Sequence, residues 1–264
     1  MNLERITNQV REISIKAGDF ILSEWNQLSS ENIEAKGFND FFTYVDTTSE
    51  KMLVKELKEL LPDAGFIVEE NTIEAPGNET YKWIVDPLDG TTNYIHGLKP
   101  FSVSIALAKD NRVILGVVNE LGCNEIFHAW EGTPAFLNGS EIHVSTIPSL
   151  KNSIIGTGFP FKDFERVDAY LGLLKYFMKN SHGIRRFGSA AVDLCYIACG
   201  RLEAFFEYGL KPWDVAAGTF ILRQSGGLVS DFSGGEDYLF NREIVAANSK
   251  VFDEFLNQTM KYLK

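Results

Sequence analysis

The chain has 264 residues and a mass of 29.6 kDa, with 45% hydrophobic and 23% charged residues. This composition excludes a disordered chain, and the length predicts one large domain or two closely packed ones. Its 25 Lys and Arg against 36 Asp and Glu give a net charge of −11, which opposes broad binding to nucleic acid backbones. Three cysteines are too few for a disulfide framework, and no apolar run reaches the roughly 18 residues of a membrane span. We therefore expect a cytoplasmic protein without a membrane partner, for which nucleic acid is an improbable ligand.

Two amphipathic helices are expected before the first strands. Apolar residues recur at spacings of three and four over residues 3–20, so one helix should run towards Trp25. The segment 47–50 has the pattern of a capping box, which predicts that a second helix begins there. Pro62 should end that helix, because proline cannot continue it.

Short runs of β-branched and aromatic residues predict a sheet in the middle of the chain, at 65–68, 82–85, 102–108 and 113–118. The turn at 109–112 should join the last two runs in a hairpin. Farther along, similar reasoning predicts helices at 166–178, 190–199 and 215–224, and strands at 202–207, 227–230 and 244–247.

This mixture of elements indicates layered α+β architecture and not the repeated βα units of a Rossmann or barrel fold. Pro148 lies in a segment, 142–153, that also contains several Ser and Thr residues. Such composition is typical of a boundary between compact units. We therefore expect an N-terminal subdomain over 1–147 and a C-terminal subdomain over 148–264.

The segment 83–93 is an apolar strand that ends abruptly in two carboxylates, a proline and a glycine. Gly90 permits a tight turn, so Asp86 and Asp89 can converge while the amides of Gly90 and Thr91 begin the next helix. Free N–H groups at that point favour a phosphate. The same residues would also suit an ordinary surface turn, and the segment alone leaves both interpretations open.

Further acids follow other predicted elements. Glu69 and Glu70 end the strand at 65–68, and alternation should send their side chains to opposite sides. Asp214 precedes a helix. Carboxylates gathered in this number would repel one another unless cations bind them, and hard oxygen donors favour Mg²⁺ over zinc or copper. The alternative is that these acids are scattered surface charges.

Several other sites are excluded by spacing. The chain has no Walker A motif, no nucleophile elbow and no His-Glu-x-x-His pattern. The motif at 156–158, Gly-Thr-Gly, lacks the third glycine of a dinucleotide-binding fingerprint. Cys195 and Cys199 lie one helical turn apart in an apolar segment, which favours core thiols over metal ligands.

Taken together, these residues resemble the inositol monophosphatase family of the lithium-sensitive, magnesium-dependent sugar phosphatase superfamily. Its signature Trp-x-x-Asp-Pro-x-Asp-Gly-Thr-x-Asn is matched at 83–93, and its second signature, Trp-Asp-x-Ala-Ala-Gly, is matched at 213–218. Lys36, Thr43 and Asp46 fit a third family element, and 185–191 fit its substrate-side glycine segment. The resemblance implies a layered αβαβα sandwich of the inositol monophosphatase and fructose-1,6-bisphosphatase type.

The resemblance also implies two or three Mg²⁺ ions per subunit. One would be held by Glu69, Asp86 and the carbonyl of Leu88, and a second by Asp86, Asp89 and Asp214. Asp86 would thus bridge the two ions. Two cations would neutralise phosphate oxygens and lower the pKa of water, which creates a nucleophile at neutral pH.

Catalytic and supporting roles follow from the same resemblance. Thr91, hydrogen-bonded to Asp46, would orient the attacking water together with Glu69. Glu70 would support the metal site from behind. Lys36 would steady the segment that carries Asp46, although an exposed lysine is an equal alternative.

On the substrate side, the resemblance implies contacts that bind the phosphate and the alcohol, from Asp89, Gly90, Thr91, Ser189, Ala190 and Glu207. Glu207 would accept hydrogen bonds from ring hydroxyls. It lies seven residues before Asp214, across Gly209 and Pro212, so a bent loop could bring both acids to one pocket.

The implied activity is that of an inositol-1-monophosphatase: hydrolysis of myo-inositol monophosphate, or a similar polyol phosphate, by a homodimer that lithium inhibits. Within the same class, the alternatives are a broad sugar phosphatase acting on fructose 1,6-bisphosphate and a 3′-phosphoadenosine 5′-phosphate nucleotidase. A different class is a regulatory partner of the transcription machinery, as some bacterial relatives are. Arg185 and Arg186 could serve that role or lie at the dimer interface.

Overall fold

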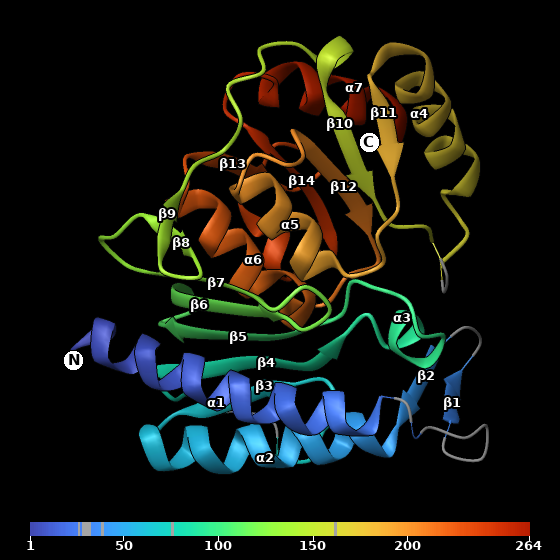
Figure 1. The fold of residues 1–264 in the computed structure, drawn as a ribbon. Coiled ribbons are helices and arrows are strands. Elements are labelled where there is room, and N and C mark those ends of the chain that lie inside the picture. The colour runs from blue at the N-terminus through green and yellow to red at the C-terminus, as the bar shows by residue number, and fades with distance from the viewer. Residues whose placement is uncertain (26, 28–32, 38–39, 75–76, 161–162) are drawn as a thin grey trace.

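The computed structural model describes the chain except residues 26, 28–32, 38–39, 75–76 and 161–162, and at 33–37 and 40–42 it describes the backbone alone. Helices and sheets alternate in layers from one side of the molecule to the other: helices, sheet, helices, sheet, helices (Figure 1). This arrangement is the layered α+β fold that the sequence predicts.

The first layers are built by the N-terminal half. Helices α1 (Leu3–Glu24) and α2 (Tyr44–Leu60) lie side by side beneath a sheet whose strand order is β3-β4-β5-β6-β7-β8-β9 (Figure 1). Its strands are β3 (Gly65–Val68), β4 (Tyr81–Asp89), β5 (Ser102–Lys109), β6 (Arg112–Glu120), β7 (Glu125–Trp130), β8 (Ala135–Leu137) and β9 (Ser140–Ile142). Strands β3 and β4 are parallel, and the other neighbours are antiparallel. The buried stripe of α1, including Val10 and Ile21, packs into the core beneath this sheet.

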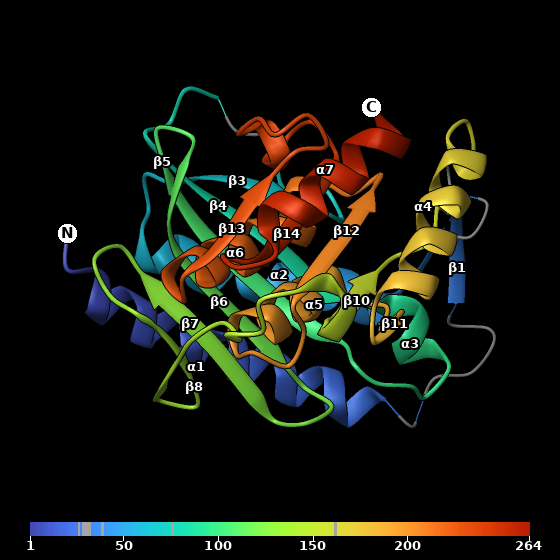
Figure 2. The ribbon, with the colours of Figure 1, turned by 90° about the horizontal axis from the view of Figure 1, so that it is seen from above.

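The later layers come from the C-terminal half. A second sheet has the order β11-β10-β12-β14-β13. Its strands are β10 (Ile154–Thr157), β11 (Gly183–Arg185), β12 (Ala204–Tyr208), β13 (Gly227–Ser230) and β14 (Glu243–Asn248). Helices α5 (Ala190–Ala198) and α6 (Pro212–Gln224) fill the space between the two sheets, and α4 (Val167–Asn180) and α7 (Phe252–Leu263) cover the outer face (Figures 1 and 2).

Smaller elements complete the fold: the pair β1 (Ile33–Gly37) and β2 (Asp40–Thr43), the short helix α3 (Thr91–Ile95), and the 3-10 turns η2 (Leu150–Asn152) and η3 (Asp237–Leu239). Helix α3 follows β4 and lies below β11 in Figure 1. The side-chain amide of Asn93 in α3 donates to the carbonyl of Phe187, just after β11, at 2.7 Å. The turn after β4 of the first sheet is thereby tied to the segment after β11 of the second sheet.

The predicted start of the second helix is wrong by one turn. The capping box lies at Thr43 and Asp46, not at 47–50: the Thr43 amide donates to Asp46 Oδ2 at 2.8 Å, and Thr43 Oγ1 accepts from the Val45 amide at 3.1 Å. Glu50 is instead fully buried and accepts hydrogen bonds from two amides of the 70–72 segment. An earlier cap outcompetes the later one because it satisfies free amides at the helix start.

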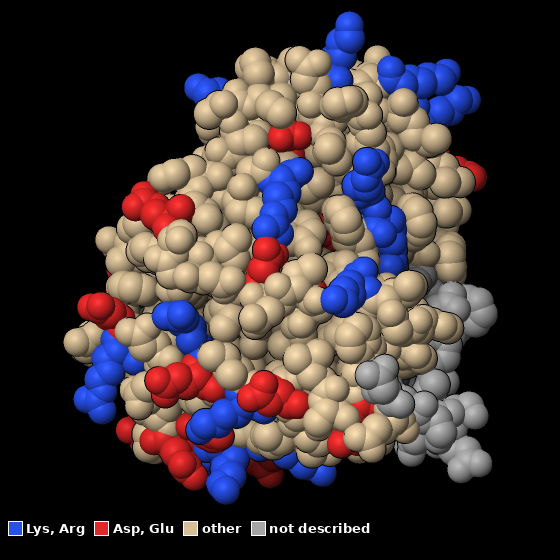
Figure 3. Space-filling model, viewed as in Figure 1, with Lys and Arg blue, Asp and Glu red and all other residues tan. Residues whose placement is uncertain are grey.

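The chain passes from the first sheet to the second between Ile142 and Ile154, the segment in which we expect a subdomain boundary. The division into units 1–147 and 148–264 stays a prediction. Across the described residues, no helix is both long and apolar enough to cross a membrane. On the face shown in Figure 3, basic and acidic side chains are interspersed, and large areas carry neither.

Gly116 of β6 sets how closely α6 approaches the first sheet. A Cβ atom at this position would lie 2.8 Å from the carbonyl oxygen of Ala217 and 3.1 Å from its Cα. Both are backbone atoms, so they cannot move aside as a flexible side chain would. The absence of a side chain at Gly116 therefore lets the helix rest directly on the strand.

Gly116→Val should lower the free energy of unfolding by about 1–3 kcal/mol, because the added atoms force helix and sheet apart. Urea denaturation measures this change. Gly77→Val is the matched control, since the nearest atoms to its new Cβ are those of the Glu79 side chain, at 3.6 Å. Equal losses in the two variants would contradict the packing argument.

Candidate active site

The end of β4 brings two carboxylates to the edge of the first sheet. The pairing of β4 with β5 shifts between Asp86 and Asp89, so the strand bulges around the proline between them. The Leu88 amide donates to Asp86 Oδ1 at 2.9 Å. Gly90 then begins α3 with a φ of 94°, a conformation that glycine adopts without strain.

Thr91, the first residue of α3, links this turn to α2. Its hydroxyl lies 3.1 Å from Asp46 Oδ1 and 2.9 Å from the carbonyl oxygen of Leu88. Asp46 is fully buried, and its second oxygen accepts from both the amide and the hydroxyl of Thr43. The helix cap of α2 and the orientation of Thr91 therefore depend on one carboxylate.

Asp214 reaches the same region from the start of α6. The Lys211 amide donates to Asp214 Oδ2 at 2.7 Å, which satisfies a free amide at the helix N-terminus. The hydroxyl of Ser104 on β5 donates to the carbonyl of Trp213 at 3.2 Å. This contact holds the first turn of the helix against the sheet that carries the other acids.

Asp89 is held by the start of α5. Its Oδ2 accepts a hydrogen bond from the hydroxyl of Ser189 at 2.6 Å and one from the amide of Ala191 at 2.8 Å. Residues a hundred positions apart in the chain thus meet at one oxygen atom. The contact fastens the turn after β4 to the helix layer above it.

Two of these acids, Asp89 and Asp214, line a cavity of about 420 Å³ between the two halves of the chain. Its lining comes from the ends of β3, β4 and β12 and from the starts of α3, α5 and α6, and it includes Glu69, Asp89, Thr91, Ser189, Glu207 and Asp214. Glu207 is only 9% exposed and belongs to β12. The bent loop predicted between Glu207 and Asp214 is present, with Gly209 at a φ of 93°.

Burial and neighbouring negative charges disfavour the ionised form of the acids in and beside this cavity. Burial, and then the charges of Glu69, Asp89 and Asp214, raise the pKa of Asp86 well above its usual range. Burial raises the pKa of Asp89 to about 6, against the hydrogen bonds from Ser189 and Ala191. Burial and the charge of Asp89 raise the pKa of Asp214 to about 7. Buried like charges of this kind favour protonation or a bound cation.

Glu207 is subject to the same effects. Burial, and then the charge of Asp214, raise its pKa to about 8, although the guanidinium of Arg186 acts in the opposite direction. Arg186, which belongs to the segment 185–191 that resembles the family's substrate-side element, lines the cavity.

The donor set suits a hard divalent cation. Carboxylate and carbonyl oxygens are the ligands that Mg²⁺ prefers, and a cation would relieve the repulsion among these buried groups. Within the part of the chain that the structure describes, no three His, Cys, Asp or Glu side chains are already drawn together as a metal-binding group. The fit therefore rests on the chemistry of the donors and on their buried charges.

The predicted site residues differ in how they reach the cavity. Eight of them line it: Glu69, Asp89, Gly90, Thr91, Ser189, Ala190, Glu207 and Asp214. Asp86 and Leu88 lie buried at the end of β4, and Asp46 lies behind Thr91. The amide of Glu70 donates to Glu50 at 2.6 Å. Lys36 belongs to β1, and its side chain lies outside the described residues.

Sequence reasoning missed Glu50, which accepts from the amides of Glu70 and Thr72 and so orders the segment after β3. The only signal was an acid among the apolar positions of α2, and the misplaced capping box accounted for it in another way. Sequence reasoning also missed Asp193, a buried acid of α5 that lines the cavity.

Comparison with known proteins identifies the family. The model of the inositol monophosphatase family matches residues 2–263. The chain belongs to this family. A putative Nus factor SuhB of Neisseria meningitidis serogroup B is 41% identical over 241 residues, which cover 91% of this chain and 92% of that relative.

Solved structures of family members share the fold. The extragenic suppressor protein suhB of Bartonella henselae superposes with a TM-score of 0.91 at 35% identity, covering 97% of this chain and 99% of that one. An IMPase of Thermotoga maritima superposes with a TM-score of 0.88 at 33% identity, covering 98% of each chain. The layered architecture described above is therefore that of the inositol monophosphatase family.

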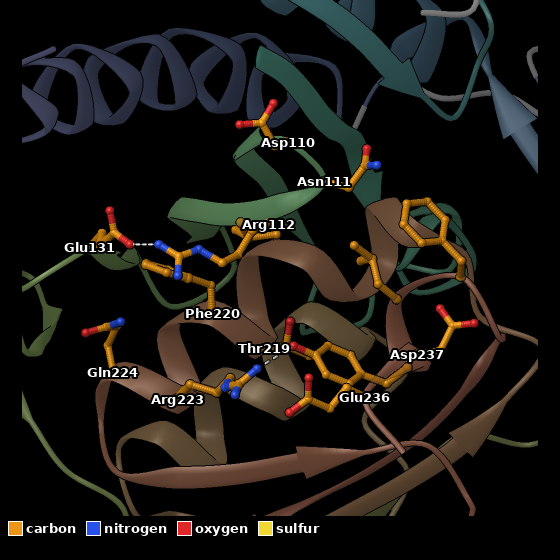
Figure 4. Close-up of a pocket in the computed structure, with 14 residues that line it drawn as sticks. Asp110, Asn111, Arg112, Glu131, Thr219, Phe220, Arg223, Gln224, Glu236 and Asp237 are labelled. Atoms are coloured by element: carbon orange, nitrogen blue, oxygen red, sulfur yellow. Dashed lines mark hydrogen bonds and ion pairs between the residues drawn. The ribbon is translucent and has the colours of Figure 1, made fainter. Parts of the chain in front are cut away.

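A larger cavity, of about 630 Å³, lies elsewhere, between the hairpin turn at 110–113, the end of α6 and the segment 236–240. In it Arg112 pairs with Glu131, and Arg223 donates to the hydroxyl of Tyr238 at 3.0 Å (Figure 4). None of the predicted site residues lines it. The buried acids and the family signatures meet at the smaller cavity, which we take as the active site.

Without divalent cations, the protein should lose stability as the pH rises from about 4 to about 8. The pKa values of Asp89, Asp214 and Glu207 are higher in the folded state than the ordinary value near 4, so folding takes up protons across this range. Added Mg²⁺ should raise the unfolding temperature more at pH 8 than at pH 5, because ionised carboxylates bind it. Thermal unfolding with chelator and with Mg²⁺ measures both effects. Greater stability at pH 8 in chelator would contradict these raised pKa values.

Proposed function

We propose that this protein is a magnesium-dependent phosphomonoesterase that hydrolyses myo-inositol monophosphate, or a similar polyol phosphate, to the free alcohol and phosphate. The observation that carries the proposal is a set of mutually repelling acids, the buried Asp86 and the half-buried Asp89 and Asp214, beside a cavity that also contains Glu207. Family membership and the likeness to an IMPase of Thermotoga maritima support it.

In this proposal the Mg²⁺ ions are held by carboxylates and one carbonyl, from Glu69, Asp86, Leu88, Asp89 and Asp214. When bound, Mg²⁺ supplies positive charge to the phosphate oxygens and makes water a stronger nucleophile at neutral pH. The protein's own contribution is to hold the donors in place. A single oxygen of Asp89 accepts from Ser189 and Ala191, which leaves the other oxygen for an ion.

Thr91 orients the attacking water. Its one hydroxyl proton is directed towards Asp46 and the Leu88 carbonyl, so its oxygen can accept a hydrogen bond from water. Glu69, on the same cavity, accepts from the other side of that water. Fixing the nucleophile in this way reduces the entropy lost on the way to the transition state.

The alcohol occupies the side of the cavity formed by α5 and β12. Glu207 accepts hydrogen bonds from hydroxyl groups there, and Ser189 and Ala190 line the approach. A cavity of about 420 Å³ suits a small polyol. Homodimer formation and inhibition by lithium are part of the same proposal.

Asp89→Asn should reduce magnesium-dependent release of phosphate from myo-inositol 1-phosphate by a factor on the order of 10³ or more, because it removes a charge from the metal site. A steady-state phosphate assay measures the loss. Asp110→Asn, in the exposed β5–β6 turn, is the matched control and should keep wild-type rates. Undiminished turnover in Asp89→Asn would refute the assigned metal site.

The names of several relatives favour a second function. The Neisseria protein, at 41% identity, is called a putative Nus factor. We infer that this chain also binds the transcription machinery, through a surface separate from the cavity. Nothing in the chemistry of the buried acids is needed for such a contact.

Binding to RNA polymerase and Nus factors, purified from Neisseria meningitidis, should therefore survive in Asp89→Asn while phosphatase activity is lost. Size-exclusion chromatography of the mixed components reads out the complex. If wild type and variant both elute alone, the second function is wrong, and the phosphatase proposal is unaffected.

A further inference from the structure

The two glycines at the end of β10, Gly156 and Gly158, have no role in the proposed metal site. Successive positions of a strand point to opposite sides. Gly156 and Gly158, the latter just after β10, therefore face one side, and Thr157 faces the other. Thr157 Oγ1 lies 2.9 Å from the hydroxyl of Tyr170 and 2.8 Å from the carbonyl oxygen of Phe206. The threonine therefore anchors the strand while the glycines leave space on its other face.

Two carboxylates occupy that space. A Cβ atom on Gly158 would lie 1.9 Å from Glu207 Oε1, and a Cβ atom on Gly156 would lie 3.0 Å from Asp193 Oδ1. Any side chain at Gly158 would thus displace the Glu207 carboxylate, and one at Gly156 would crowd Asp193. The end of β10 therefore leaves space for two acids from different elements, Glu207 of β12 and Asp193 of α5.

Asp193 is the acid that the proposed mechanism leaves unused. It is 2% exposed and lines the cavity together with Glu207. Its Oδ1 atom is buried and has no hydrogen-bond partner among the described residues. Burial, and then the charges of Glu207 and Asp89, raise the pKa of Asp193 well above its usual range. A buried acceptor without a donor costs free energy, so a rotation of this side chain that lets it accept from a ligand hydroxyl in the cavity is favourable.

We propose that Asp193 is a specificity-determining residue whose carboxyl group, after a rotation towards the cavity, accepts a hydrogen bond from a hydroxyl group of the leaving alcohol, next to the hydroxyl accepted by Glu207. The two carboxylates above the glycine pair then select phosphate esters of polyols over those of alcohols that carry no further hydroxyl. The inference rests on the phosphatase function proposed above and extends it. A site that hydrogen-bonds a substrate hydroxyl discriminates strongly against an analogue that lacks it.

The test compares two esters, myo-inositol 1-phosphate and p-nitrophenyl phosphate, in wild type, Asp193→Asn and Asp193→Ala. In Asp193→Ala, kcat/KM for the inositol ester should fall about tenfold to a hundredfold, mainly through KM, and that for the aryl ester should stay within about twofold. Asp193→Asn keeps the shape of the side chain and should give a smaller loss with the same selectivity.

Asp231→Asn is the matched control, a buried aspartate of the same half of the chain that accepts from the amides of Ser233 and Gly235. This variant should keep the wild-type kcat/KM for both esters. A second measurement avoids turnover: free myo-inositol at high concentration should raise the unfolding temperature of wild type and Asp231→Asn but not of Asp193→Ala.

Equal losses on both esters in the Asp193 variants, or no loss on either, would overturn the role of Asp193 and leave the phosphatase proposal standing. A wild-type protein that hydrolyses neither ester with Mg²⁺ would overturn the proposed function and this inference with it. Loss of the thermal shift in the control variant as well would assign the effect to folding and not to recognition.

Discussion

Repulsion among buried and half-buried carboxylates is the constraint on which the rest of the structure depends. Asp86 and Asp89 come from β4, Asp214 from α6 and Glu207 from β12, and their charges raise one another's pKa values or those of their neighbours. Bringing such charged groups together in the protein lowers the free energy of unfolding. The large apolar cores on both sides of the junction between the two halves, where the acids lie, offset this loss of stability.

Three acids of the candidate site are held in a common manner. One oxygen of each accepts from a nearby backbone or hydroxyl donor: Asp86 from the Leu88 amide, Asp89 from Ser189 and Ala191, and Asp214 from the Lys211 amide. The same donors also complete a strand bulge, a helix start and an interlayer contact. The local structure and the arrangement of the site therefore have the same cause.

Much of this could be predicted from residues that lie close together in the chain. The segment 83–93 encodes its strand, its turn and the short helix in one stretch, and the strong apolar periodicity of α1 predicts that helix well. The residues that were missed depend on distant partners: Glu50 on the amides after β3, and Asp193 on Gly156 of a strand that was not predicted. Strands of three residues, such as β8 and β11, carry too short a pattern to detect, whereas the apolar spacing of α7 was available and overlooked.

The central claim is that divalent cations bind these acids and relieve their repulsion. Anomalous diffraction from crystals grown with Mn²⁺ tests it directly, because the ion scatters strongly and prefers the same oxygen ligands as Mg²⁺. The account predicts anomalous peaks between the carboxylate oxygens of Asp86, Asp89 and Asp214. Well-ordered density for these side chains with no peak between them would contradict it.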